Sequence, residues 1–270
     1  MGSPERGLPI SFVHTRTVLE TAGFVALGLA VGTIGTLIGA GGGFILLPVL
    51  ALLSPLEPTG TLTATTLAVV AANATSGAIA YGRQGRIDLR SGSLFALATL
   101  PGGIAGALLA RSIPRGPFDV AFALVLLALA LVLVRLPTEP RPATAGRRLP
   151  LGVAISFVIG FASSLLGIGG GFIHVPVLIA VLGFPVHIAT ATSHFVLAIS
   201  ATVGTVTHIL AGDLSSTWPR TIAIASGAIA GAQLGAVLSR RVRGALIVRI
   251  LAFALVAVAL RLAAQGLLGI

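Results

Sequence analysis

The chain has 270 residues, of which 56% are hydrophobic and only 9% are charged, with a formal net charge of +10 and no cysteine. Soluble domains carry about 25% charged residues, and a chain of this length cannot hide so much apolar surface from water. A soluble globular protein is therefore excluded, as are disulfides and thiolate metal sites. The positive charge lies in short gaps between apolar runs, as in membrane-protein loops, so the expected partner is the lipid bilayer and no nucleic acid is expected.

The apolar segments along the chain predict membrane-spanning helices. Residues 1–16 are polar and are expected to form an N-terminal tail. Two long apolar segments, Val18–Leu53 and Leu151–Leu182, are interrupted near the middle by a glycine cluster. A spanning helix needs about 20 mostly apolar residues. The segments that meet this requirement without interruption are Thr63–Tyr81, Ser91–Ala110, Phe118–Leu136, Ile188–Ile209, Arg220–Leu238 and Ala245–Ala264.

The two glycine clusters indicate an internal duplication. The first reads GAGGGFILLPVL over residues 39–50, and the second reads GIGGGFIHVPVL over residues 167–178. Downstream, TATTL at residues 63–67 matches TATSH at residues 190–194. Because order and spacing agree, the chain is expected to contain two copies of one membrane-spanning unit.

The duplication divides the chain into a first membrane repeat at residues 17–136 and a second at residues 151–265. The segment between them, 137–150, is polar and proline-rich and is expected to form an exposed cytoplasmic linker. After each glycine cluster comes an apolar arm, Phe44–Leu53 or Phe172–Leu182, which at 1.5 Å per residue covers about half a bilayer. We therefore expect each cluster to form the tip of a re-entrant hairpin, or a helix break, near the midplane.

A hairpin followed by three full spans would place the second repeat upside down relative to the first. The distribution of arginine supports this inversion, because the loop at residues 83–90 is rich in arginine whereas its counterpart at 213–220 is not. In the next pair of loops, at residues 111–115 and 240–243, it is the second repeat that carries more arginine. The predicted fold is an all-α polytopic membrane protein of two inverted repeats, each a glycine-tipped hairpin plus three transmembrane helices. A single kinked span in place of each hairpin, which would give parallel repeats, remains the alternative.

The glycine tips are the expected substrate site. A helix that begins at mid-membrane has free N–H groups and about half a positive charge at its start, and glycine lets an anion approach them. Acidic residues occur only near span ends or in loops, whereas a cation carrier usually buries a carboxylate, so a small anion is expected. The candidate substrate-binding residues are Gly41, Gly42, Gly43, Gly169, Gly170, Gly171, Thr65, Thr66, Asn73, His174, Thr192, Ser193 and His194.

Each candidate also has a structural explanation. The glycines could permit close helix packing, the hydroxyls could bond to their own backbone, and His174 and His194 could be neutral packing residues instead of proton-coupling or substrate contacts. The pairs Gly102/Gly106 and Gly231/Gly235 could serve internal packing or a homodimer. No catalytic motif is found, so no enzyme activity, metal or cofactor is expected.

The motifs resemble the sulfite exporter TauE/SafE family, also called the toluene-sulfonate uptake permease group. The resemblance rests on the paired GxGGGxxxxP clusters, on TATT and TATS, and on YGRQGRIDL at residues 81–89. It implies a multi-pass secondary transporter of the bacterial inner membrane that moves sulfite, sulfoacetate or another sulfonate. Together with the inverted repeats it leads us to expect alternating access, with H+ or Na+ as the candidate coupling ions. A passive channel for anions or small solutes, and a carrier of another small organic anion, remain alternatives. The second repeat has His174 and His194 where the first has Leu46 and Leu67.

Overall fold

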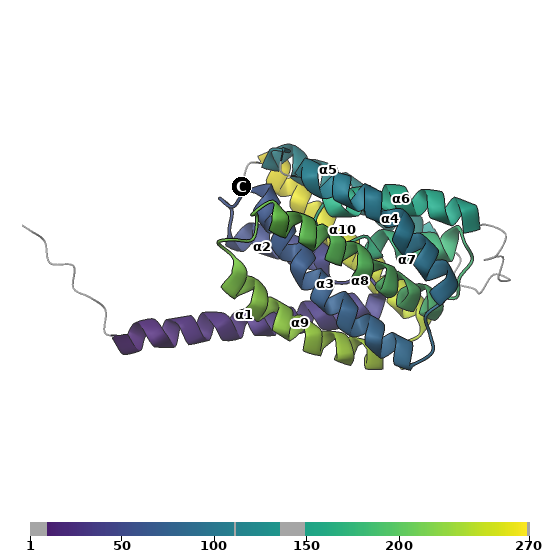
Figure 1. Ribbon diagram of the computed structural model, residues 1–270, viewed down its shortest axis with the longest axis horizontal. Helices are drawn as coiled ribbons and strands as arrows, with labels where there is room; N and C mark the ends of the chain where they lie inside the picture. Colours follow the sequence, from purple (N-terminus) through teal and green to yellow (C-terminus); the bar gives the residue numbers. More distant parts are fainter. Residues whose placement is uncertain (1–9, 111, 136–148, 269–270) are drawn as a thin grey trace, which may run out of the picture.

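The computed structural model describes residues 10–110, 112–135 and 149–268, and within these ranges the protein consists of ten helices and no strands (Figure 1). The predicted all-helical class is confirmed. Most of the predicted tail and linker, residues 1–9 and 137–148, lies outside the described ranges. The first repeat forms α1 (Ile10–Ile38), α2 (Gly43–Leu53), α3 (Thr59–Arg83), α4 (Leu89–Ala110) and α5 (Arg115–Arg135); the second forms α6 (Leu149–Leu165), α7 (Gly171–Ala180), α8 (Val186–Leu210), α9 (Trp218–Leu238) and α10 (Gly244–Leu268).

Five of the described helices are long and apolar enough to cross a bilayer: α1 from Val18 onward, α3, α4, α8 and α9. By contrast, α2 and α7 contain only 11 and 10 residues. At 1.5 Å per residue they cover about half of a 30 Å hydrocarbon core. The structure therefore confirms that each glycine cluster separates a longer helix from a short one.

The two repeats interlock through equivalent helix pairs. Helix α1 packs along α9 of the other repeat, and α6, the counterpart of α1, packs along α4, the counterpart of α9. Glycines allow both contacts: a Cβ at Gly227 or Gly231 would overlap the backbone of α1, and one at Gly102 or Gly106 would overlap the backbone of α6. In both pairs the contacting residue numbers rise together, so the paired helices run parallel.

Helices α3 and α8, which are counterparts, pack against each other in the centre of the bundle (Figure 1). Leu67 of α3 lies beside Gly204 of α8, whereas Gly77, farther along α3, lies beside His194, nearer the start of α8. The two helices are therefore antiparallel. Antiparallel packing of two equivalent helices is the arrangement that an inverted repeat would give.

Helices α1 and α2 form a hairpin whose tip lies inside the bundle. The turn between them passes Val70 in the middle of α3. Ser54, directly after α2, accepts a hydrogen bond from Arg220 near the start of α9, at 2.8 Å. Because α1 runs parallel to α9, the outer ends of α1 and α2 lie at the same end of the bundle.

Candidate functional site

Two glycine turns, residues 39–43 and 167–171, form the candidate site, and every residue in them is buried. An L residue in a left-handed conformation costs about 1–2 kcal/mol, so a run of such positions both requires glycine and ends a helix. The first turn has positive φ at Gly39 (78°), Gly41 (72°) and Gly42 (79°), and the second at Gly167 (66°), Gly169 (63°) and Gly170 (21°).

The two turns touch each other where the short helices begin. A Cβ at Gly43 would lie 2.5 Å from the carbonyl oxygen of Ile168 in the other turn. Likewise, a Cβ at Gly171 would lie 2.8 Å from the carbonyl oxygen of Gly39. Only glycine permits this backbone approach at both positions, which explains why each cluster continues to a third consecutive glycine.

Two apolar side chains cover both turns. Val70 of α3 and Leu197 of α8 hold equivalent positions in the two repeats, and both are fully buried. A Cβ added at Gly41 or at Gly169 would meet both of these side chains. The centre of the site is therefore nearly symmetrical, with bare glycine backbone beneath one valine and one leucine.

Backbone amides at the starts of α2 and α7 lack hydrogen-bond partners within the described residues. They are the amides of Gly42, Gly43 and Phe44 in the first turn and of Gly169, Gly170 and Phe172 in the second. Free N–H groups at a helix start carry partial positive charge, and leaving such a donor unpaired in a buried place costs about 1–3 kcal/mol. Each turn thus offers three donors that a bound anion could satisfy.

A buried polar cluster lies beside the first turn. Asn73 Nδ2 donates to the carbonyl oxygen of Gly41 at 3.2 Å, and Thr36 Oγ1 lies 3.2 Å from both Asn73 Oδ1 and His194 Nε2. The Tyr81 hydroxyl donates to the carbonyl oxygen of Thr36 at 2.6 Å, and its ring meets the His194 ring edge-on. The structure thus joins two predicted residues, Asn73 and His194, with two that the sequence pattern did not indicate.

Ser193 bridges the two turns. Its hydroxyl lies 3.2 Å from the carbonyl oxygen of Gly39 in the first turn and 3.2 Å from that of Gly171 in the second. Its counterpart Thr66 instead bonds to Leu62 in its own helix, at 2.8 Å. The predicted hydroxyl pair is therefore asymmetric, with only the member from the second repeat in contact with the turns.

Comparison with known proteins identifies the family. The family model described as "Sulfite exporter TauE/SafE" matches residues 24–262. The chain belongs to this family. It is 30% identical over 267 residues to a probable membrane transporter protein, YunE, of Bacillus subtilis, covering 90% of this chain and 97% of that protein.

More distant TauE/SafE relatives carry similar names. A probable membrane transporter protein of Xylella fastidiosa is 27% identical over 219 residues, or 80% of this chain and 82% of the relative. Another, MJ0441 of Methanocaldococcus jannaschii, is 26% identical over 192 residues, or 69% and 72%. No solved structure matches the chain. The family and the long apolar helices together make this a multi-pass membrane protein of a transporter family.

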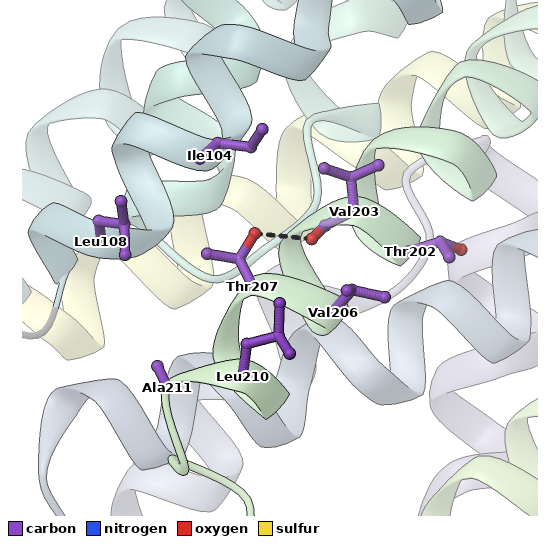
Figure 2. A pocket seen from close by; sticks show the side chains of 8 residues that line it. All are labelled: Ile104, Leu108, Thr202, Val203, Val206, Thr207, Leu210 and Ala211. Atoms are coloured by element: carbon purple, nitrogen blue, oxygen red, sulfur yellow. Dashed lines mark hydrogen bonds between the residues drawn. The ribbon is translucent and has the colours of Figure 1, made fainter.

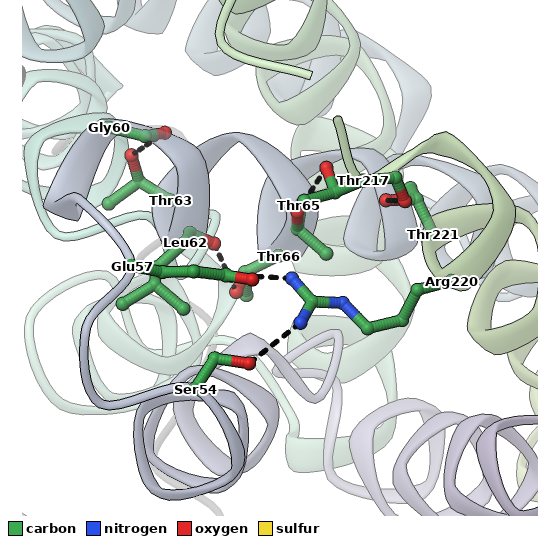
Figure 3. A network of polar contacts seen from close by, with 10 residues as sticks. All are labelled: Ser54, Glu57, Gly60, Leu62, Thr63, Thr65, Thr66, Thr217, Arg220 and Thr221. Carbon is green, nitrogen blue, oxygen red and sulfur yellow. Dashed lines mark hydrogen bonds and ion pairs between the residues drawn. The ribbon is translucent and has the colours of Figure 1, made fainter. Parts of the chain in front are cut away.

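Two predicted threonines of this TauE/SafE protein lie at helix starts and not at the turns. Thr65 Oγ1 is 3.1 Å from the hydroxyl of Thr217, the residue that caps α9 (Figure 3). Its counterpart Thr192 accepts a hydrogen bond from the amide of Asp88, just before α4, at 3.0 Å. These contacts join α3 to α9 and α8 to α4 at opposite ends of the bundle, and a substrate-binding role for either threonine stays a prediction.

His174 lies between α6 and α7. Its Nε2 is 3.3 Å from the hydroxyl of Ser156, and its Nδ1 is 3.3 Å from the carbonyl oxygen of Gly170. The ring thus links α6 to the second turn, which agrees with the structural explanation of His174 as a helix–helix contact. Its spacing from the glycine tip could not reveal which face of α7 it occupies, and a role in substrate binding or proton coupling stays a prediction.

An ion-pair network at the outer end of the first hairpin was not indicated by the sequence pattern. Arg220 donates to Glu57 Oε2 and to Ser54 Oγ, each at 2.8 Å, and so ties the end of α2 to the start of α9 (Figure 3). Glu57 and Arg220 lie far apart in sequence, so the sequence pattern could not show that the two charges meet. Within the described residues, no group of three His, Cys, Asp or Glu could hold a metal ion.

Proposed function

We propose that the chain is a secondary transporter that carries a small sulfur-containing anion, such as sulfite, sulfoacetate or another sulfonate, across the bacterial inner membrane. One observation carries the proposal: two buried glycine turns meet in the bundle centre, and each has three amides without a hydrogen-bond partner among the described residues. Oxyanions accept several hydrogen bonds at once, and helix starts favour negative charge. The family description as a sulfite exporter supports the same class of substrate.

The placement of acidic side chains also supports an anion. Among the described residues, Glu57 forms an ion pair with Arg220 at 2.8 Å, and Asp213 Oδ2 lies 2.8 Å from His208 Nδ1, within hydrogen-bond distance. Asp88 accepts hydrogen bonds at the start of α4. A negative guest between the turns would therefore meet partial positive charge without an opposing carboxylate.

We further infer that the repeats lie inverted in the membrane and work by alternating access. The antiparallel α3 and α8, and the equivalent pairs α1–α9 and α4–α6, support this inference. In inverted-repeat transporters, movement of the two repeats opens a midplane site to each side in turn. Because Val70 and Leu197 cover both turns, we expect these side chains to move when substrate reaches the amides.

The arginines give the orientation that we propose. The loops after α3 and α9 adjoin, since Arg86 Nη1 donates to Ser239 Oγ at 2.9 Å. Arg83 at the end of α3, and Arg240 and Arg241 after α9, lie at the same end of the bundle. Basic loops stay on the cytoplasmic side, so this end of the bundle would face the cytoplasm.

Anion flux into proteoliposomes tests the proposal. Sulfite, sulfoacetate, taurine, thiosulfate and lactate would each be offered with and without an imposed H+ or Na+ gradient. We expect saturable uptake of at least one sulfur-containing anion, with accumulation only when one of the gradients is present. Uptake that never exceeds equilibration would indicate a passive channel, preference for lactate would indicate another organic anion, and no flux of any anion would refute the proposal.

A further inference from the structure

A groove on the flank of the bundle, between α4 and α8, is apolar. It has a volume of about 570 Å³ and includes Ile104, Leu108 and Leu210 in its lining (Figure 2). The hydroxyl of Thr207 donates to the carbonyl oxygen of Val203 in its own helix, at 2.9 Å. The surface of this α4–α8 groove is thus suited to hydrocarbon alone.

A second groove, of about 540 Å³, lies between α3, α8 and α9 and has a polar wall. Gln233 Nε2 donates to the hydroxyl of Ser76 at 2.7 Å and to its carbonyl oxygen at 2.9 Å. Ala71, near the middle of α3, and Arg83, at its end, both line this α3–α9 groove. The guanidinium of Arg83 is exposed and forms no hydrogen bond or ion pair with other described residues.

The two grooves are equivalent positions of the duplicated unit. Arg83 is the last residue of α3, and Leu210 is the last residue of α8. Gln233 occupies the same place in α9 that Ile104 occupies in α4. Because α3 and α8 are antiparallel, the grooves open toward opposite ends of the bundle. The copies have therefore diverged: one has a cation and an amide where the other has leucine and isoleucine.

The dimensions and charge of the α3–α9 groove suit a lipid. From Ala71 to Arg83 the helix rises about 18 Å, close to the roughly 15 Å depth of one hydrocarbon leaflet. More positive charge lies at the same end of the bundle. Arg86 Nη1 donates to Ser239 Oγ at 2.9 Å, directly before Arg240 and Arg241 in the chain, so an anion at this end would meet several guanidinium groups.

We propose that the α3–α9 groove binds an anionic phospholipid, with the headgroup phosphate on Arg83 and one acyl chain along α3 toward Ala71. The α4–α8 groove, which lacks the cation, accepts acyl chains without preference for the headgroup. A juxtamembrane arginine attracts anionic lipid through its charge, and Arg83 has no hydrogen-bond or ion-pair partner among the described residues that lipid binding would displace. This lipid site is separate from the glycine turns and does not depend on the transported substrate.

Native mass spectrometry of the purified protein in detergent tests this proposal. The protein would be titrated with phosphatidylglycerol and with phosphatidylcholine of the same acyl chains. We expect the first bound phosphatidylglycerol to be retained about fivefold better than phosphatidylcholine, and Arg83→Leu to abolish this preference. Arg83→Lys, which keeps the charge, should retain it, and Leu210→Arg should create a second preferred site in the α4–α8 groove.

Three outcomes would overturn the proposal. The first is that Arg83→Leu keeps the headgroup preference although its melting temperature matches that of the unaltered protein. The second is that phosphatidylcholine binds the unaltered protein as well as phosphatidylglycerol does. The third is that glycerol phosphate displaces the lipid at equal concentration, which would assign Arg83 to a free-phosphate site and not to a lipid.

Discussion

Alanine at Gly43 should push the two glycine turns apart. The added methyl carbon would lie 2.5 Å from the carbonyl oxygen of Ile168 and 2.9 Å from its Cα, whereas ordinary contacts begin at 3.4 Å. The nearest atoms are all backbone, so the second turn must retreat by about 0.9 Å, and overpacking of this kind costs about 1–3 kcal/mol. Gly43 does not have a positive φ, so left-handed strain adds nothing to this cost.

Thermal unfolding and anion flux together measure this effect. We expect Gly43→Ala to melt several degrees lower than the unaltered protein, at about 2–4 °C per kcal/mol, and to lose most of its flux because the amides are displaced by nearly 1 Å. Gly23→Ala is the control, since a Cβ at that helical position would meet nothing within 4 Å. If Gly43→Ala matched Gly23→Ala in both assays, close contact between the turns would be refuted.

Further substitutions separate strain, hydrogen bonding and charge. At Gly42 (φ 79°) alanine adds left-handed strain and a clash with Val31, whereas at Gly212 (φ 81°) alanine adds strain alone. Gly42→Ala should therefore lower the melting temperature by several degrees more than Gly212→Ala does. Equal losses in the two variants would contradict the close packing of Gly42 against Val31. Ser193→Ala removes the hydroxyl that bonds both turns and should cost about 1–3 kcal/mol in thermal unfolding, unlike Ser200→Ala, whose hydroxyl bonds within its own helix. His194→Leu, which installs the residue found at the equivalent position of the first repeat, should abolish flux without preventing membrane insertion, and undiminished flux would remove His194 from the site.

Much of the fold could be predicted because the membrane makes helix length and polarity informative. The span predicted at Thr63–Tyr81 is α3 (Thr59–Arg83), and that predicted at Arg220–Leu238 is α9 (Trp218–Leu238). The breaks at the glycine clusters followed from the same reasoning, since a dozen apolar residues cannot cross a bilayer. The pairing of α1 with α9 was not predictable, because helix partners depend on surface fit that a single sequence does not display.

The candidate site was predictable only in part. Glycine runs mark positions where backbone approaches backbone, so the turns themselves were found. The sequence could not show that Thr65 faces the cap of α9, or that His174 faces Ser156 in α6, because spacing along one helix does not identify the neighbouring helix. Thr36 was missed because a single threonine hydroxyl in an apolar run is common and usually bonds to its own backbone. Tyr81 was missed because its position at the end of a span does not show that its hydroxyl reaches Thr36 in α1.

The exchange of partners between the repeats constrains how the protein is made. Helix α1 ends at Ile38 and so leaves the ribosome early, whereas its partner α9 begins only at Trp218 and is made much later. At ribosomal speeds of roughly 5–20 residues per second, the glycine-lined face of α1 waits on the order of ten to forty seconds in lipid before it is covered. Because α1 and α6 each pack along a helix of the other repeat, we expect a nascent chain truncated before α9 to be a substrate for membrane quality-control proteases, and not a half-sized folded product.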